Sequence, residues 1–428
     1  MISGWLANLV SLLSLGLVVG AYVFVSRREK SYINLLTPIF LIDVPVSYLL
    51  PLLYLNWFGV EASSYAYIYV YATKAVESWV FAYAYTRSGT RPIRLPFTYG
   101  YANFGGLALF GVSAAVLAYL PILIQFRQDL LNPRRIYEQT RIGFGVNFYI
   151  SSTLAYLSVM LILFSKKSFL TKAFVVITCG LVLALHGSKG EVLALIMLWV
   201  IFEVYVRGHR FRLAPAIIAA GAIAIAGFGL FAATMVLGTP VEALETISQY
   251  SDYTRNAMML IDSNFPRQYG RLVWESNVLG IVPRALMPNK PEDFGAFRLD
   301  TEFYPKAIDL GQGAPAFGVG TQYADFGFLA IVYVAMFAAL TGWLARVFLR
   351  RLTLTRHPAD FLVFAFLAGI GIFPIGTGWL FPETLLVAMV LRLASCVGAK
   401  EVYRESIRHT EPAIMAAKLT NPHGLAGA

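Results

Sequence analysis

Long apolar stretches recur along almost the whole chain, and they restrict the fold to helices that cross a lipid bilayer. Because the bilayer core offers no water to backbone N–H and C=O groups, an apolar stretch of ~20 residues spans it as a helix. Only 14% of the 428 residues are charged, against about a quarter in soluble domains. The sequence therefore predicts an all-α, polytopic integral membrane protein. We expect about 11 transmembrane helices, at 5–25, 33–54, 66–85, 104–124, 144–164, 169–185, 191–206, 213–237, 326–348, 361–375 and 380–397.

Basic residues predict the orientation of these spans. Clusters of Arg and Lys follow the first, third, fifth, seventh, ninth and last spans, and threading eleven spans alternately puts all six clusters on one side. Cytoplasmic loops are enriched in Lys and Arg, so this side is predicted to be the cytoplasm. We expect one membrane domain over 1–428, a large periplasmic loop at 238–325 and a cytoplasmic tail at 405–428.

Two loops on the opposite, outer side are also rich in cations. The loop 125–142 contains Arg134, Arg135 and Arg141, and the loop 238–325 contains seven more basic residues. Either these charges are tolerated in water, or they bind an anionic partner at the bilayer surface, such as a lipid-linked pyrophosphate or an acidic glycan. The long loop also contains seven aromatic residues between Trp274 and Tyr323, which predicts an ordered segment. The net charge of +10 is partly this positive-inside bias and does not indicate a nucleic acid partner.

No pattern in the sequence indicates a metal or another cofactor. The two cysteines, Cys179 and Cys396, fall within apolar stretches, and the five histidines form no cluster with ligand spacing. Lys74 and Glu77 lie three apart in the third span and can pair on one helix face. Such a pair either joins helices or serves transport, and the absence of an internal repeat argues against a transporter.

Polar segments of the outer loops contain residue types that suit phosphate groups. The turn 186–191 places Lys189 between glycines, which allow close approach of a ligand; a simple turn with a lysine extended to the membrane surface explains it equally. Arg271 and Trp274 are three apart on a predicted short helix and face the same way. An arginine such as Arg284 can bind two phosphate oxygens with its planar guanidinium.

Four motifs in this region resemble a known family. They are Gly187-Ser188-Lys189-Gly190, Gly270-Arg271-x-x-Trp274, Pro283-Arg284 with Pro288-x-Lys290-Pro291, and Gly320-x-Gln322-Tyr323-x-x-Phe326-Gly327. Their order and spacing resemble those of Wzy-type polysaccharide repeat-unit polymerases and the related O-antigen ligases, over roughly residues 180 to 350. Two positions depart from the family pattern: Lys189 stands where arginine is common, and Gln322 where glutamate or histidine is common. Glutamine cannot act as a base.

The resemblance implies a membrane glycosyltransferase of the bacterial inner membrane that needs no cofactor. Its partners would be undecaprenyl-pyrophosphate-linked oligosaccharides, the lipid bilayer and a chain-length regulator protein, with the active site facing the periplasm. A sugar hydroxyl of one glycan would attack the anomeric carbon of another, and the lipid pyrophosphate would leave.

Residue roles follow from the motifs and the charges together. We predict Arg271 and Arg284 as clamps on the pyrophosphate, and Asp325 or Glu275 as a base. The predicted substrate-binding residues are Lys189, Arg134, Arg135, Arg141, Lys290, Gln322 and Tyr323.

Two other functions remain open from the sequence. An O-antigen ligase would use the same donor and pass the glycan to lipid A core, although the Pro-x-Lys-Pro segment and the missing loop histidine favour the polymerase. A lipid-linked glycan flippase or another transporter would instead line an inner cavity with its basic groups.

Overall fold

A computed structural model describes most of the chain and shows only helices as regular elements in its described part. The described residues are 4–51, 62–87, 103–130, 133–140, 144–187, 189–218, 221–222, 252–280, 282, 286–291, 293–306, 316–369 and 384–395. The predicted tail at 405–428 and most of the eighth predicted span lie outside these residues. The predicted all-helical class is confirmed for the described part.

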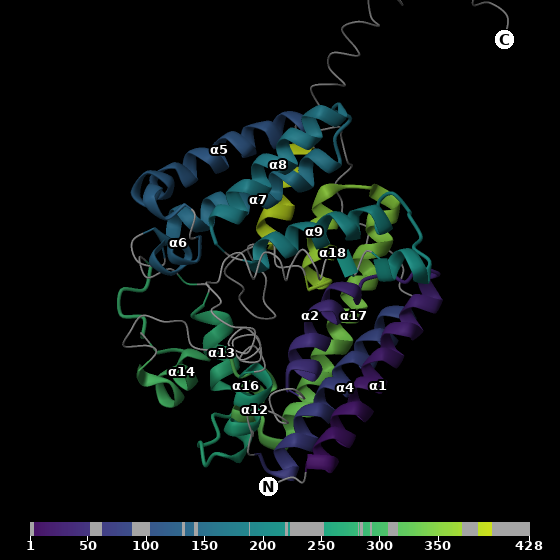
Figure 1. Cartoon of the computed structure of the whole chain (residues 1–428), viewed down its shortest axis with the longest axis vertical. Helices are drawn as coiled ribbons and strands as arrows, with labels where there is room; N and C mark the ends of the chain where they lie inside the picture. The colour runs from purple at the N-terminus through teal and green to yellow at the C-terminus, as the bar shows by residue number, and fades with distance from the viewer. Residues whose placement is uncertain are drawn as a thin grey trace, which may run out of the picture.

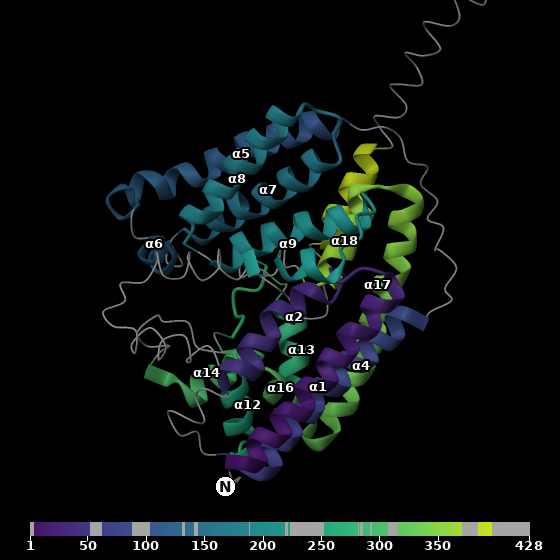
Figure 2. The ribbon, with the colours of Figure 1, turned by 45° about the vertical axis from the view of Figure 1, so that its right-hand side comes forward.

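Three long helices form one bundle, namely α1 (Gly4–Glu29), α4 (Ser64–Arg87) and α17 (Ala330–Thr355). They lie side by side in both views (Figure 1, Figure 2). Gly342 allows α17 to approach α4 closely, because a Cβ atom there would lie 2.6 Å from the Phe81 carbonyl oxygen. This bundle positions the long polar loop, whose helices pack near the amino-terminal ends of α1 and α4.

The second predicted span begins later than predicted and changes helix type along its length. Helix α2 (Thr37–Val44) passes into a π-helical turn, η1 (Pro45–Leu49), and the backbone stays helical on both sides of it. Pro45 has no backbone N–H and therefore cannot continue the hydrogen-bond pattern of α2. The change of helix type falls beside the polar groups of Asp43 and Ser47.

A second group of apolar helices packs beside this bundle (Figure 1). It contains α5 (Phe104–Gln125), α7 (Gly145–Leu163) and α8 (Phe169–Leu185), which pack against one another, followed by α9 (Lys189–Tyr205). Helix α18 (Pro358–Leu367) connects the two groups through contacts with α7, α9 and α17. Their shared core includes Tyr156, Phe202, Phe361 and Phe364, which are almost fully buried.

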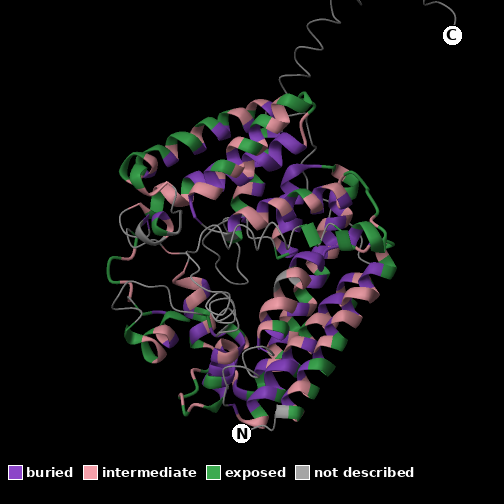
Figure 3. Ribbon diagram, in the orientation of Figure 1, coloured by how far each residue is buried: buried purple, intermediate pink, exposed green. Residues whose placement is uncertain are grey.

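Exposed residues lie along the outer faces of the helices (Figure 3), and many of them are large and apolar. Leu13, Phe110, Leu117 and Met336 are each more than half exposed. Exposed apolar surface on this scale suits contact with lipid. Helices long and apolar enough to cross a membrane occupy Trp5–Glu29, Phe104–Gln125, Gly145–Leu163 and Val319–Thr355, and shorter apolar helices occupy Phe169–Leu185, Pro358–Leu367 and Thr384–Ser395. The count of eleven spans stays a prediction.

The described part of the long polar loop, residues 238–325, is folded, as its aromatic content predicts. It contains α12 (Asp252–Asp262), α13 (Arg271–Val278), α14 (Phe297–Phe303) and α16 (Val319–Phe326), and α16 leads through η4 (Gly327–Leu329) into α17. A small core of Leu260, Leu272, Leu299, Phe317 and Ala324 holds these helices together. The second cation-rich loop forms η2 (Arg127–Asp129) and α6 (Pro133–Thr140), and α6 lies toward the same side of the molecule as α14 in both views (Figure 1, Figure 2).

The close ion pair of Lys74 forms with a different residue from the one expected. Its Nζ lies 2.9 Å from Asp43 Oδ1 of α2 and 2.8 Å from Ser47 Oγ of η1, and its charge also acts on Glu77 of its own helix. Lys74 therefore does join two helices, as one of the two expectations had it, but the pair connects α4 to Asp43 of α2.

Candidate functional site

The candidate site is organised around the amino-terminal end of α13. Asp325 of α16 is 1% exposed, and its two carboxylate oxygens accept hydrogen bonds from the backbone N–H groups of Leu272 (3.0 Å) and Val273 (2.8 Å). Such a carboxylate satisfies N–H groups that have no partner within the helix and also interacts favourably with the helix dipole. Asp325 therefore fixes where α13 begins, relative to the helix that enters α17.

The backbone before α13 follows α16 closely. The N–H groups of Gln268 and Tyr269 donate to the carbonyls of Ala324 and Asp325, each at 3.0 Å. Gly270 then takes a φ of 89°, a conformation that costs glycine little and other residues more. This turn explains the glycine of the Gly-Arg-x-x-Trp motif, because it reverses the chain directly before Arg271.

Glu275 joins two arginines from separate helices. Its Oε1 lies 2.7 Å from Nε of Arg271, and its Oε2 lies 2.9 Å from Nε of Arg298 on α14. Oε2 also accepts a hydrogen bond from the backbone N–H of Gly295 at 2.8 Å. The carboxylate thus connects α13 to the segment 293–298 through side chain and backbone at once.

These contacts keep Glu275 ionised. Partial burial would raise its pKa, but the hydrogen bonds from Arg298, Gly295 and Arg271 together outweigh burial and lower the pKa to about 2. A carboxylate with so low a pKa is a poor proton acceptor near neutral pH. Its geometry suits holding arginines in place.

Arg271 is held at one end and open at the other. Only its Nε contacts Glu275, and its terminal nitrogens have no hydrogen-bond partner among the described residues. The side chain is 54% exposed, and Trp274 on the same short helix is 65% exposed. The predicted helix and its shared face are confirmed, and the free edge of the guanidinium has the geometry that binds two phosphate oxygens.

Arg298 is more enclosed than Arg271. Its side chain is 23% exposed, and it contacts Asp293 at 3.4 Å in addition to Glu275. The backbone beside it is tightly packed, because a Cβ atom on Gly295 would meet Ser276 Oγ at 2.2 Å. This close approach lets the Gly295 N–H reach Glu275.

Lys290 lies next to the same segment. Its Nζ is 4.2 Å from the centroid of the Phe294 ring and 3.1 Å from the Val282 carbonyl oxygen. A cation over an aromatic face is held electrostatically. The Pro-x-Lys-Pro segment is therefore anchored beside the Asp293–Arg298 segment.

Tyr323 and Gln322 are adjacent on α16 but lie in different surroundings. Tyr323 is 6% exposed, packs edge-on against Tyr69 of α4 at 5.0 Å, and carries Arg267 over its ring at 4.2 Å. Arg267 also donates to the Tyr323 carbonyl at 2.6 Å. Gln322 is half-buried. Tyr323 therefore joins the loop to the bundle, and Gln322 has the greater access to a ligand.

The remaining predicted residues are placed only in part. Arg135 on α6 is 59% exposed and pairs with Asp129 at 2.9 Å. Arg134 lies on α6 and Lys189 begins α9, but their side chains fall outside the described part of the chain, as do Arg141 and Arg284 altogether. Within the described ranges, no group of three or more His, Cys, Asp and Glu residues could hold a metal ion.

Two arginines of the site received no role from the sequence. Arg298 and Arg267 were counted among the loop cations, but their partners lie 23 and 56 residues away along the chain. Helical spacing reveals pairs such as Arg271 with Glu275. It gives no signal for a pair that forms between separate helices.

Comparison with known proteins gives two close relatives. The apolar helices and the ordered, cation-rich loop define the class as an integral membrane protein with an arginine cluster outside its helical bundle. Two O-antigen polymerases, from Salmonella typhimurium (strain LT2) and Salmonella typhi, are each 34% identical to the chain over 395 residues, covering 91% of this chain and 95% of each relative. No protein-family model and no solved structure gave a significant match. The chain belongs to the O-antigen polymerase family.

Proposed function

We propose that the chain polymerises lipid-linked oligosaccharide repeat units by glycosyl transfer. The relatives that match nearly the whole chain are named O-antigen polymerases. The observation that carries the mechanism is the arrangement of Glu275, which holds Arg271 and Arg298 by their Nε atoms and leaves the terminal nitrogens of Arg271 open.

The reaction requires stabilisation of a departing pyrophosphate. A hydroxyl oxygen of the acceptor glycan forms a bond to the anomeric carbon of the donor, while the bond from that carbon to the pyrophosphate oxygen breaks. The hydroxyl proton ends on the released lipid pyrophosphate, so atoms and charge balance. Cations placed where negative charge develops lower the barrier of such a step. In the cluster of Arg271, Glu275 and Arg298, here called the α13 cluster, Arg271 is the more exposed cation.

The two carboxylates act as positioning residues in this proposal. Asp325 fixes the start of α13 and Glu275 fixes the orientation of Arg271. The sequence suggested either one as a base, but each accepts several hydrogen bonds in the structure. Proton transfer to the leaving group removes the need for a carboxylate base.

The proposed location is the periplasmic face of the bacterial inner membrane. The one-sided basic clusters support this orientation, and α6 and α14 lie toward one side of the molecule (Figure 1). Undecaprenyl-pyrophosphate-linked glycans are the proposed donor and acceptor. Lys290, Gln322, Lys189, Arg284, Arg134, Arg135 and Arg141 are proposed to contact the glycan or the second lipid, and Tyr323 to support them. A chain-length regulator is a proposed protein partner.

Deleting the gene tests whether the protein polymerises repeat units, because the length of the glycan on lipopolysaccharide can be read from a gel. We expect lipopolysaccharide with single repeat units attached to the core, visible as one band on a gel, and long polymer when the gene is restored. Loss of all attached glycan would contradict polymerisation and would indicate a ligase or a flippase. Restoration with Lys306→Ala, an exposed cation in the same loop outside the arginine cluster, serves as the matched control and should give long polymer.

A further inference from the structure

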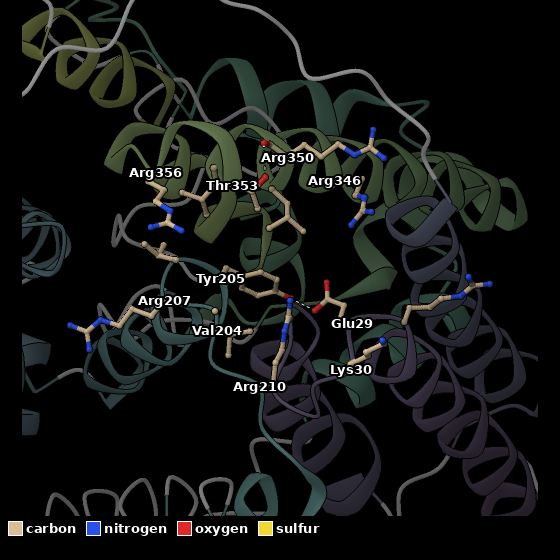
Figure 4. A pocket seen from close by; sticks show the side chains of 15 residues that line it. Glu29, Lys30, Val204, Tyr205, Arg207, Arg210, Arg346, Arg350, Thr353 and Arg356 are labelled. Atoms are coloured by element: carbon tan, nitrogen blue, oxygen red, sulfur yellow. Dashed lines mark hydrogen bonds between the residues drawn. The ribbon is translucent and has the colours of Figure 1, made fainter.

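A basic pocket lies at the end of the helical bundle away from the long polar loop. It has a volume of about 610 Å³ and is formed where the carboxyl-terminal ends of α1, α9 and α17 meet (Figure 4). Its cations come from three separate chain segments, each at the predicted cytoplasmic end of a span. They are Arg28, Lys30, Arg207, Arg210, Arg346, Arg350 and Arg356.

The pocket contains far more positive than negative charge. Glu29 is the only carboxylate among its lining residues, and both of its oxygens already accept hydrogen bonds, from the hydroxyls of Tyr85 and Tyr205. Tyr205 is fixed in turn, because its oxygen accepts the backbone N–H of Leu35 at 2.7 Å. The buried tyrosines thus satisfy the carboxylate. Arg207 pairs with Glu203 at 2.8 Å, and the other lining cations form no ion pair with a described residue.

Two arginines point toward this centre and form no ion pair with a described residue, although the Arg346 guanidinium lies 5.9 Å from the centroid of the Tyr85 ring. Arg210 and Arg346 are the cations whose charges act on Glu29, and Figure 4 shows them approaching it from different sides. The Nε of Arg346 is buried and has no hydrogen-bond partner among the described residues. A buried donor without a partner is costly and needs a ligand or water to satisfy it.

The rest of the lining is apolar and lies at the end of the membrane spans. Val204, Val206, Leu349 and Leu352 line the pocket beside the cations. The apolar helices Trp5–Glu29 and Val319–Thr355 both end there, so the pocket sits where a bilayer meets water. Basic pockets between such helix ends suit lipid head groups, whereas a soluble anion gains nothing from the aliphatic side.

We propose that this pocket binds the head group of an anionic membrane lipid that carries two phosphate groups, on the side opposite the long polar loop. Arg210 and Arg346 bind one phosphate beside Glu29, and the other phosphate lies nearer the rim, where Arg350 and Arg356 add positive charge from opposite sides (Figure 4). Val206 and the accessible edge of Leu349 contact the glycerol and the first acyl carbons, and the more deeply buried Val204 and Leu352 form the floor beneath them. The site is separate from the α13 cluster, and the inference does not depend on the proposed reaction.

Native mass spectrometry of the full chain in mild detergent tests the proposal, with cardiolipin and phosphatidylethanolamine offered at equal concentration. We expect preferential retention of cardiolipin. Losing two charge-assisted contacts in R210Q/R346Q should lower the retained fraction at least about tenfold. The second double variant, R350Q/R356Q, leaves the interior of the pocket intact and should also bind less. Lys166→Gln, an exposed cation on the same predicted side outside the pocket, should bind as the wild type does.

Three results would overturn the proposal. They are equal retention of the two lipids, unchanged retention in R350Q/R356Q, or displacement of cardiolipin by inorganic pyrophosphate at equal concentration. The last result would assign the pocket to a soluble anion. If R210Q/R346Q does not fold, R350Q/R356Q alone decides, because its two side chains lie toward the rim.

Discussion

At the scale of single residues, Glu275 connects most of the candidate site. One carboxylate orients Arg271, pairs with Arg298 and accepts the Gly295 N–H. Because its pKa falls to about 2, below the ordinary value of about 4.3, the sign of its pH effect is fixed. Its contribution to stability is full above about pH 4.3 and is lost as the pH falls through 2. Activity changes between pH 5 and 8 should therefore not come from Glu275.

Replacement of Glu275 by glutamine tests this role. The amide keeps the size of the side chain but loses the charge that pairs with two arginines, so we expect destabilisation of about 1–3 kcal/mol and a slower polymerisation at every pH from 5 to 8. Melting curves and polymer length on a gel measure the two effects. Glu302→Gln on α14, an exposed carboxylate of the same loop, is the control. Wild-type melting and polymer in Glu275→Gln would contradict the assigned role.

At the scale of elements, α13 is placed by contacts from outside itself. Its own sequence predicts a short helix with Arg271 and Trp274 on one face, and the structure agrees. What the sequence does not show is that Asp325, 53 residues away, supplies the cap.

Asp325→Asn and Asp325→Ala together distinguish a cap from a base. Asparagine keeps one of the two acceptor oxygens that Asp325 offers to Leu272 and Val273, and alanine keeps neither; loss of a cap costs about 0.5–2 kcal/mol. If Asp325 only positions α13, we expect activity to fall in step with the loss of thermal stability, less in Asp325→Asn than in Asp325→Ala. Loss of all activity in Asp325→Asn with melting close to that of the wild type would show that the carboxylate itself takes part in the chemistry.

Features set by one stretch of sequence could be predicted, whereas contacts between segments distant in the chain could not. The apolar stretches predicted α1, α4, α5, α7 and α8 well. A segment that crosses the bilayer must satisfy its backbone hydrogen bonds as a helix, so the length of the apolar stretch sets the length of the helix. Contacts between distant segments were missed: Lys74 pairs with Asp43, 31 residues away, and Arg298 pairs with Glu275, 23 residues away. Spacing along one helix cannot reveal such partners. The change of helix type at Pro45 could have been predicted, since proline lacks the N–H that continues the α-helical hydrogen bonds.

At the scale of the whole molecule, the proposed function depends on the orientation of the helical bundle across the membrane. The arginine cluster of the long polar loop must lie on the periplasmic side, and the basic pocket of α1, α9 and α17 on the cytoplasmic side. Single cysteines in a protein without Cys179 and Cys396 test this arrangement. Thr301→Cys should react with an impermeant thiol reagent in intact cells, and Ser168→Cys should react only after the cells are opened. Both positions are exposed, so labelling of Ser168→Cys in intact cells would reverse the orientation.

The most direct measurement is polymerisation of purified lipid-linked repeat units by the reconstituted protein with Arg271 replaced. Loss of a charge-assisted contact of ~1.5–3 kcal/mol predicts a rate on the order of ten- to a hundredfold lower for Arg271→Ala. Arg271→Lys should recover only part of the rate, since an ammonium cannot replace the planar guanidinium. Lys306→Ala should retain the wild-type rate. Long polymer at the wild-type rate from folded Arg271→Ala would contradict the assignment of this loop as the donor site.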